Sequence, residues 1–184
     1  MVCGIWVEIQ ARKGGYHCNG TGMPRSLRPS KYCQSPSQPC KCHGNLTLFS
    51  AKDVSHMHLL GFGAVLRMHQ EDYSDPSRYQ PAQWRPAVVL AGVTDSSVQG
   101  LTIVSTGGDG ISVYAGSSPA QPPTERVLLK DLTIRQAYRN ALSVTSARDL
   151  VVEGCTFADT CRQHGNFGGP CSGVDMEPDY HHEE

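Results

Sequence analysis

A pattern of two short apolar strands is written three times between Leu101 and Glu177. The paired strands of the three copies cover residues 101–103 and 111–113, 132–134 and 142–144, and 155–157 and 174–176. A single repeat of this size cannot bury its apolar face alone, so such repeats are typical of stacked architectures. The sequence therefore predicts an all-β fold, a right-handed parallel β-helix (a solenoid). In it each turn of chain, here called a rung, adds a strand of three to five residues to two or three parallel sheets.

The third copy differs from the other two by an insertion. Its extra residues match 162–170, which lie between Cys161 and Cys171. We expect these two cysteines to form a disulfide that closes the insertion. Cys155 takes the place of Leu101 and Leu132 in the alignment, so it is expected to point inward as a small apolar residue.

The alternation of apolar and polar residues assigns an interior to the coil. A register that is wrong by one residue would reverse both faces of every strand. The residues expected inside are Leu101, Ile103, Ile111, Val113, Leu129, Leu132, Ile134, Leu142, Val144, Val152, Cys155, Phe157, Val174 and Met176.

With 184 residues, the chain is expected to form one β-helix domain. Residues 7–9 alternate and are assigned to an early rung, and the coil is expected to resume at residues 46–48. Polar loops are expected at 69–86, 115–124 and 161–171. A Cys-rich loop is expected at 18–44, held by disulfides of undetermined pairing. Zinc is the alternative there, since Cys40, Cys42 and His43 offer soft ligands.

Charge and cysteine usage limit the partners and the compartment. The chain has 16 basic and 17 acidic residues, which does not indicate a nucleic-acid or anionic-membrane surface, and no apolar run reaches membrane-spanning length. Eight cysteines and acceptor patterns for N-glycosylation at Asn19 and Asn45 favour an extracellular or secretory setting. The first residues do not resemble a signal peptide. The last strand lacks a polar cap, so we expect a piece of a longer β-helix, poorly behaved in isolation.

Residues aligned on neighbouring rungs form columns, here called ladders, spaced by about 4.8 Å. Placing Ile111, Leu142 and Val174 inward in register predicts three polar ladders on one face. These are Ser112, Ser143 and Asp175 in the first, Tyr114, Thr145 and Glu177 in the second, and Asp109, Asn140 and Ser172 at the corner, with Arg139 beside them.

Two carboxylates stand out on this face, because acidic residues are uncommon in strands. Asp175 and Glu177 share the outward side, with backbones about 6.5 Å apart. Such a pair fits catalysis across a glycosidic bond, or it can bind Ca²⁺ through oxygen ligands. The alternative is an ordinary solvated strand face, with Asp109 capping a turn and Arg139 a surface charge.

Several segments resemble the repeats of right-handed β-helix proteins of the pectate-lyase-like superfamily. They are Gly-Gly-Asp-Gly-Ile at 107–111, Tyr-Arg-Asn-Ala-Leu-Ser-Val at 138–144, Gly-Val-Asp-Met-Glu-Pro at 173–178, and 63–69 as an earlier rung. The resemblance covers about residues 45–180. It implies a secreted protein that acts on or binds polysaccharide, often an acidic one. The signatures of polygalacturonases and pectate lyases are absent, so no catalytic residue carries over from either.

The favoured hypothesis is a glycoside hydrolase or polysaccharide lyase. In a hydrolase, Glu177 would donate the proton and Asp175 would act as base or nucleophile, while Asp109, Arg139, Asn140 and Tyr114 would bind the substrate. In a lyase, the carboxylates would hold a cation such as Ca²⁺ and Arg139 or a histidine would remove the proton. The alternatives are a non-catalytic carbohydrate-binding solenoid and an inert structural segment. Converging carboxylates in a groove favour an enzyme; an aromatic groove without a carboxylate pair favours binding.

Overall fold

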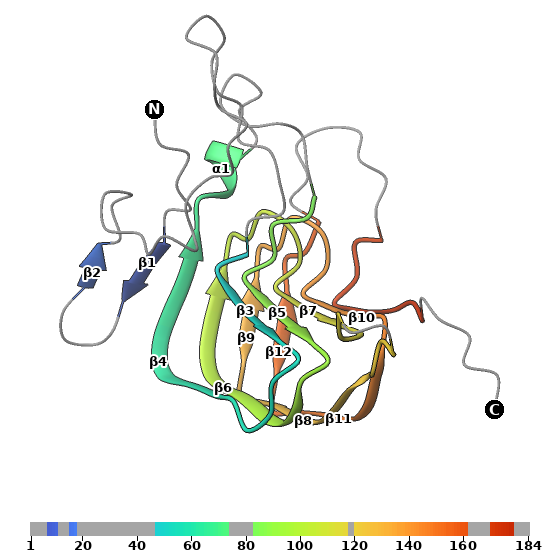
Figure 1. The fold of residues 1–184 in the computed structure, drawn as a ribbon. Coiled ribbons are helices and arrows are strands. Elements are labelled where there is room, and N and C mark those ends of the chain that lie inside the picture. Colours follow the sequence, from blue (N-terminus) through green and yellow to red (C-terminus); the bar gives the residue numbers. More distant parts are fainter. Residues whose placement is uncertain are drawn as a thin grey trace, which may run out of the picture.

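The computed structural model describes residues 7–10, 15–17, 47–73, 83–117, 120–161 and 170–178. These residues form two β-sheets and one short helix, α1 (Gln70–Tyr73), so the fold is all-β as expected (Figure 1). All strands in the five-stranded sheet are parallel: β3 (Phe49–Lys52), β5 (Val88–Ala91), β7 (Ile111–Tyr114), β10 (Leu142–Val144) and β13 (Val174–Met176).

The second sheet has eight strands in the described part of the chain. Six pair with one another in parallel: β4 (His58–Met68), β6 (Thr94–Val104), β8 (Thr124–Lys130), β9 (Thr133–Arg135), β11 (Ala147–Glu153) and β12 (Thr156–Ala158). The other two are antiparallel: β1 (Val7–Gln10), which pairs with β4, and β2 (Gly15–His17), which pairs with β1. Residues 7–9 are therefore not a rung of the parallel stack, contrary to the expectation from their alternation.

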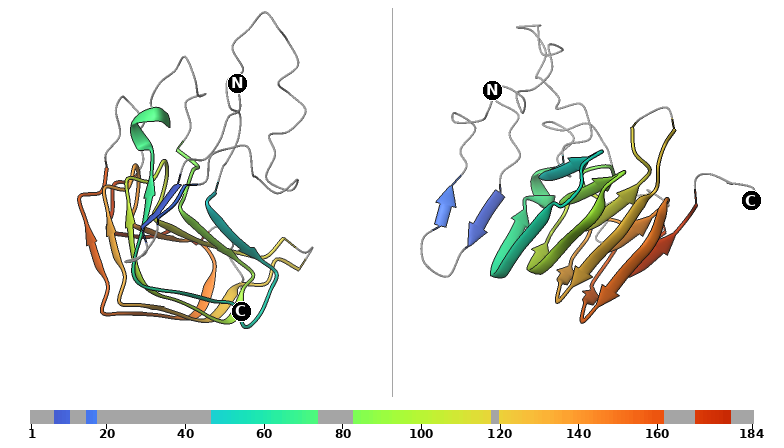
Figure 2. Two further views of the ribbon diagram at one scale, coloured as in Figure 1. Left: turned by 90° about the vertical axis from the view of Figure 1, so that its left-hand side faces the viewer. Right: turned by 60° about the horizontal axis from the view of Figure 1, so that its bottom comes forward.

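From β3 onward the chain passes back and forth between the two sheets. Each visit to a sheet adds a strand beside the one laid down on the previous visit, so sequence order and spatial order agree. Figure 2 shows this directly, with strands following one another from teal to red along the stack. Parallel pairing of this kind requires the long return path that the other sheet supplies.

The register expected from the repeats is confirmed. Ile111 pairs with Leu142 and Leu142 with Val174, which sets Ser112, Ser143 and Asp175 side by side on three successive strands. The same ladders extend back to β5 and β3, through Val88 and Phe49.

Strand length was predicted incorrectly for the eight-stranded sheet. β4 and β6 have 11 residues and β8 and β11 have 7, rather than three to five. β4 and β6 are long because each strand continues through a bend of the coil. Gly63, Gly100, Asp131 and Gly154 adopt positive φ of 82°, 71°, 52° and 64°, and the pairing register stacks them in one column. The left-handed backbone bends β4 at Gly63 and β6 at Gly100 without ending them, whereas β8 and β11 end just before Asp131 and Gly154.

The core lies between the two sheets and holds most of the residues expected inside. Eight of them are buried: Leu101, Ile103, Ile111, Val113, Leu129, Leu132, Ile134 and Leu142. Val144, Cys155 and Phe157 are partly buried and pack against this core.

Val152, Val174 and Met176 were also expected inside but are exposed, by 42%, 42% and 74%. Val152 pairs with buried Leu129, and Val174 pairs with buried Leu142. Their inward register is thus correct. They are exposed because they belong to the last strands of the two sheets, and no further described strand covers them.

The loop expectations have mixed outcomes. Part of the loop expected at 69–86 is helical, since α1 begins at Gln70. The first parallel strand begins at Phe49 rather than at the expected residues 46–48. The Cys-rich segment at 18–44 lies outside the described residues, together with Asn19 and Asn45, so its cysteine pairing and the zinc alternative stay hypotheses.

Candidate functional site

The outer face of the five-stranded sheet gathers the candidate residues. One ladder on it contains Val89, Ser112, Ser143 and Asp175. A second contains Lys52, Ala91 and Tyr114. Backbone hydrogen bonds from Thr145 to Val113 and from Glu177 to Val144 extend it across the last two strands. Lys52 and Glu177 therefore lie at opposite ends of one row.

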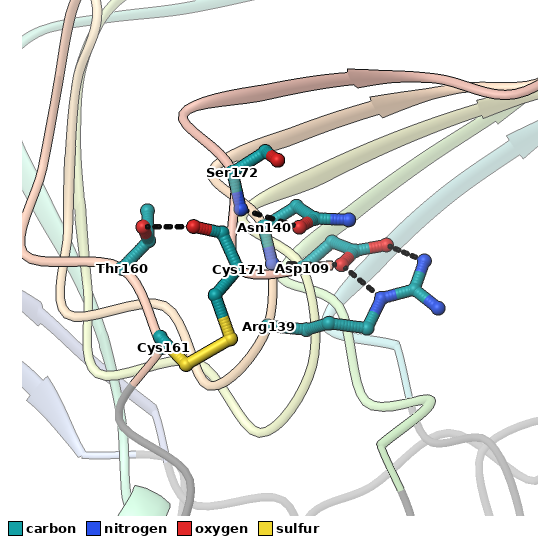
Figure 3. Close-up of a disulfide and its surroundings, with 7 residues drawn as sticks. All are labelled: Asp109, Arg139, Asn140, Thr160, Cys161, Cys171 and Ser172. Atoms are coloured by element: carbon teal, nitrogen blue, oxygen red, sulfur yellow. Dashed lines mark hydrogen bonds and ion pairs between the residues drawn. A yellow bond between two sulfur atoms is a disulfide. The ribbon is translucent and has the colours of Figure 1, made fainter. Parts of the chain in front are cut away.

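Asp109 and Arg139 form a buried ion pair at the corner that leads into this sheet (Figure 3). Arg139 Nε donates to Asp109 Oδ1 at 2.8 Å, and its Nη2 donates to Oδ2 at 3.1 Å. Asp109 also accepts hydrogen bonds from the Ser112 hydroxyl at 3.0 Å and the Asn140 backbone N–H at 3.2 Å. Both carboxylate oxygens are thus occupied by protein groups.

Arg139 is not the exposed surface charge considered from the sequence. Its side chain is 7% exposed, and its guanidinium lies 4.5 Å from the centre of the Trp84 ring. Burial works against the cation, yet the hydrogen bonds and charge of Asp109 outweigh it and raise the pKa of Arg139. The guanidinium cation therefore stacks on an aromatic ring and is held in place by its hydrogen bonds to a carboxylate.

Asn140 connects the corner to the last strand. It is fully buried, and its Nδ2 donates to Asp175 Oδ2 at 2.9 Å. Its Oδ1 accepts a hydrogen bond from the Ser172 backbone N–H at 2.9 Å, which Figure 3 shows. One oxygen of Asp175 is therefore held in place by Asn140. Asp175 is half-buried, whereas Glu177 is exposed.

A cavity of about 270 Å³ lies beside these residues, over the first strands of the same sheet. Trp84 and Tyr114 are its aromatic lining residues, and Lys52 carries the only charge among the lining residues in the described part of the chain. The described residues that line it are Thr47, Lys52, Trp84, Pro86, Val89, Ala91, Tyr114, Ala115 and Ser117. Tyr114 lies two strands from Glu177, or about 10 Å, so the carboxylate pair is beside the cavity and not in it.

Ser117, which lines the cavity, is held by Asp53, which follows β3. Its carboxylate accepts hydrogen bonds from the Ser117 backbone N–H, at 3.1 Å, and from the Ser117 hydroxyl. A Cβ on Gly116 would approach Asp53 Oδ1 to 2.4 Å, so the chain passes this close only because residue 116 is glycine. Asp53 thereby fixes the loop that begins after Tyr114.

The Cys161–Cys171 disulfide is confirmed and borders the same corner. The Cys161 N–H donates to the Arg139 carbonyl at 3.2 Å, and the Thr160 hydroxyl donates to the Cys171 carbonyl at 3.3 Å (Figure 3). The bridge thus ties the insertion to the chain that enters β13.

The residues predicted for the site lie on one sheet or at the corner that leads into it, but they do not form a single cluster. Asp109, Arg139, Asn140 and Asp175 bond to one another or to the backbone, while Tyr114 lines the cavity and Glu177 is exposed. Lys52, Asp53 and Ser117 were missed. The signal for Lys52 was available, because extending the ladder of Tyr114 back by two strands reaches it.

The described residues contain no group of three or more His, Cys, Asp or Glu that would hold a metal ion. The Ca²⁺ site of the lyase hypothesis therefore stays a hypothesis. In the same part of the chain, no helix has the length and apolar character needed to cross a membrane.

Comparisons with known proteins add no identification. No protein-family model matches the chain, and neither curated proteins nor solved structures give a significant match. The structure shows an all-β fold of mostly parallel sheets, with one disulfide, Cys161–Cys171, in the described part of the chain.

Proposed function

We propose that the chain is a right-handed parallel β-helix of the pectate-lyase-like kind, which binds an extracellular glycan in the cavity beside Trp84 and Tyr114. The solenoid is supported by the strict alternation between the two sheets and by the in-register ladders. The extracellular setting is supported by the Cys161–Cys171 disulfide, since such bonds persist in oxidising compartments.

The observation that carries the binding proposal is the lining of the cavity. Trp84 and Tyr114 present aromatic surface, Val89 and Ala91 add apolar side chains, and no carboxylate is among the lining residues described. Aromatic side chains offer rigid apolar surface with a polar tip, which suits the faces and hydroxyl groups of a sugar ring. Lys52 and Ser117 add polar groups at the edges.

Glycan-array binding followed by calorimetry tests this proposal. Trp84→Ala and Tyr114→Ala are expected to lower the affinity for the bound glycan by about tenfold each. Phe62→Ala is the matched control, because Phe62 is an aromatic residue that is 69% exposed on the other sheet. Unchanged affinity in both cavity variants, or no glycan bound by the wild-type protein, would contradict the proposal.

Glycan cleavage is the second candidate function, and one observation favours it. Asp175 and Glu177 continue the two ladders that supply the cavity with Val89, Ala91 and Tyr114, so a glycan extending along the sheet would reach them. Asn140 fixes Asp175, which suits a base or nucleophile, and exposed Glu177 is placed to donate a proton.

Product analysis over a glycan panel separates cleavage from binding. If the two carboxylates act as acid and base, Asp175→Asn and Glu177→Gln each lower turnover by about a hundredfold or more while affinity is retained. Loss of activity with a chelator would indicate the lyase, and indifference the hydrolase. If the folded wild-type protein binds a glycan but yields no cleavage products, the remaining function is glycan binding without cleavage.

A further inference from the structure

The two partners in the Arg139–Trp84 stack differ sharply in exposure. The Arg139 side chain is 7% exposed, whereas Trp84 is 42% exposed and lines the cavity. Arg139 does not line the cavity, so a ligand there meets the indole and not the guanidinium.

Asp109 fixes the orientation of the Arg139 guanidinium. Two hydrogen bonds to Asp109, at 2.8 and 3.1 Å, fix both its position and its plane. Asp109 is itself fixed by the Ser112 hydroxyl and the Asn140 N–H. A flat, rigid cation is therefore presented to one face of the indole ring.

We infer that Arg139 is a positioning residue: it holds Trp84 as the preformed wall of the cavity and does not itself contact the glycan. This inference rests on the proposed function of the cavity as a glycan site. An exposed tryptophan without such a support samples several rotamers, and ordering it on binding costs affinity. Arg139 removes that cost because the ring is already in place.

The inference differs from direct recognition of a uronate by Arg139 in two measurable ways. A positioning residue affects neutral and acidic glycans by the same factor, since it acts only through the ring. It also leaves the salt dependence of binding unchanged, because no charge on Arg139 reaches the ligand.

Arg139→Lys is the test variant. Lysine keeps the charge beside Asp109, but its ammonium has no plane to lie flat on the indole while also making two hydrogen bonds. Arg126→Lys is the matched control, because Arg126 makes the same two-pronged contact with Asp95, at 2.6 and 2.9 Å, on the other sheet. Both are made in a Trp6→Phe background, which leaves Trp84 as the only tryptophan.

The direct readout is the fluorescence of Trp84 in the free protein. Arg139→Lys is expected to raise the acrylamide quenching rate by about twofold and to lower the anisotropy, while Arg126→Lys changes neither. Affinity for neutral and acidic glycans is expected to fall by about tenfold alike, with the melting curve showing a folded protein.

Unchanged quenching and anisotropy in folded Arg139→Lys would overturn the inference. So would a loss confined to acidic glycans with an altered salt dependence, since that result assigns Arg139 to direct contact. If Arg139→Lys does not fold, Asp109→Asn/Arg139→Gln decides by the same fluorescence criterion, because it removes both buried charges together. If the wild-type protein binds no glycan, the proposed function fails, and the fluorescence result alone still supports or overturns the role of Arg139.

Discussion

Asn140 donates a 2.9 Å hydrogen bond from its side-chain amide to Asp175 Oδ2, across the parallel pair β10 and β13. The other end of the same amide accepts the Ser172 N–H at 2.9 Å. A single buried side chain thus binds both the backbone that enters the last strand and the carboxylate on its outer face. This explains how β13, a strand of three residues with one described neighbour, keeps a defined register.

Asn140→Ala is expected to lower the free energy of unfolding by about 2–3 kcal/mol, because the Ser172 N–H and the Asp175 carboxylate both lose a buried partner. Chemical denaturation measures this loss. Thr145→Ala, at the partly exposed position directly after β10, is the control and is expected to stay within about 0.5 kcal/mol of the wild-type protein. Equal stability of the two variants would show that the Asn140 bridge is unimportant.

Much of the fold was predictable because a recurring pattern of apolar residues identifies its repeats. Ile111, Leu142 and Val174 align in the sequence and pair in the structure, and period-two alternation alone determines which face they take. The long strands were not predictable in the same way. They depend on left-handed residues inside a strand, such as Asp95 in β6 and Asp149 in β11, whose preference for that conformation is too weak to identify from one sequence.

The site was predicted as a set of residues but not as an arrangement. Register placed Asp109 and Asn140 at one corner and Asp175 in the neighbouring ladder, and hydrogen bonds join the three. The burial of Arg139 was not predictable, because the ring that lies against it belongs to Trp84, which comes from a loop distant in sequence. The pattern of a strand predicts which side chains face the core and which face outward. It does not predict which other segments of the chain cover the outward face.

Gly154→Ala tests the column of left-handed corners. Gly154 has a φ of 64°, and a Cβ there would lie 2.5 Å from Asp131 Oδ1. The substitution is expected to cost about 1–2 kcal/mol of stability, which thermal and urea unfolding would measure.

Gly173→Ala is the matched control for this corner. It lies next to β13, and its nearest contact for an added Cβ is an ordinary 3.6 Å to Phe157. It is expected to be tolerated. A cost at Gly173 as large as that at Gly154 would show that φ is not the deciding factor.

The disulfide is expected to stabilise the last coil by restricting the unfolded chain. Its cysteines are 10 positions apart in the sequence, and closing a loop of this length contributes about 2–3 kcal/mol in the chain-entropy model. Cys161→Ser/Cys171→Ser should lower the urea midpoint accordingly, and a reductant should also lower the midpoint of the wild-type protein. A midpoint insensitive to both treatments would contradict the expectation.

Asp95 and Arg126 give a pH dependence of definite sign. The hydrogen bond from Arg126 lowers the pKa of Asp95 from 3.8 to about 2. Because the folded-state pKa is below the unfolded one, the contribution to stability is present above about pH 4 and is lost as the pH falls through 2. The pair is exposed, so solvent and salt screen it and the effect on stability is small.

Carboxyl NMR titration measures the pKa of Asp95 directly. In Arg126→Met it is expected to return toward 3.8, and a wild-type Asp95 that already titrates near 3.8 would show that the pair does not persist in solution.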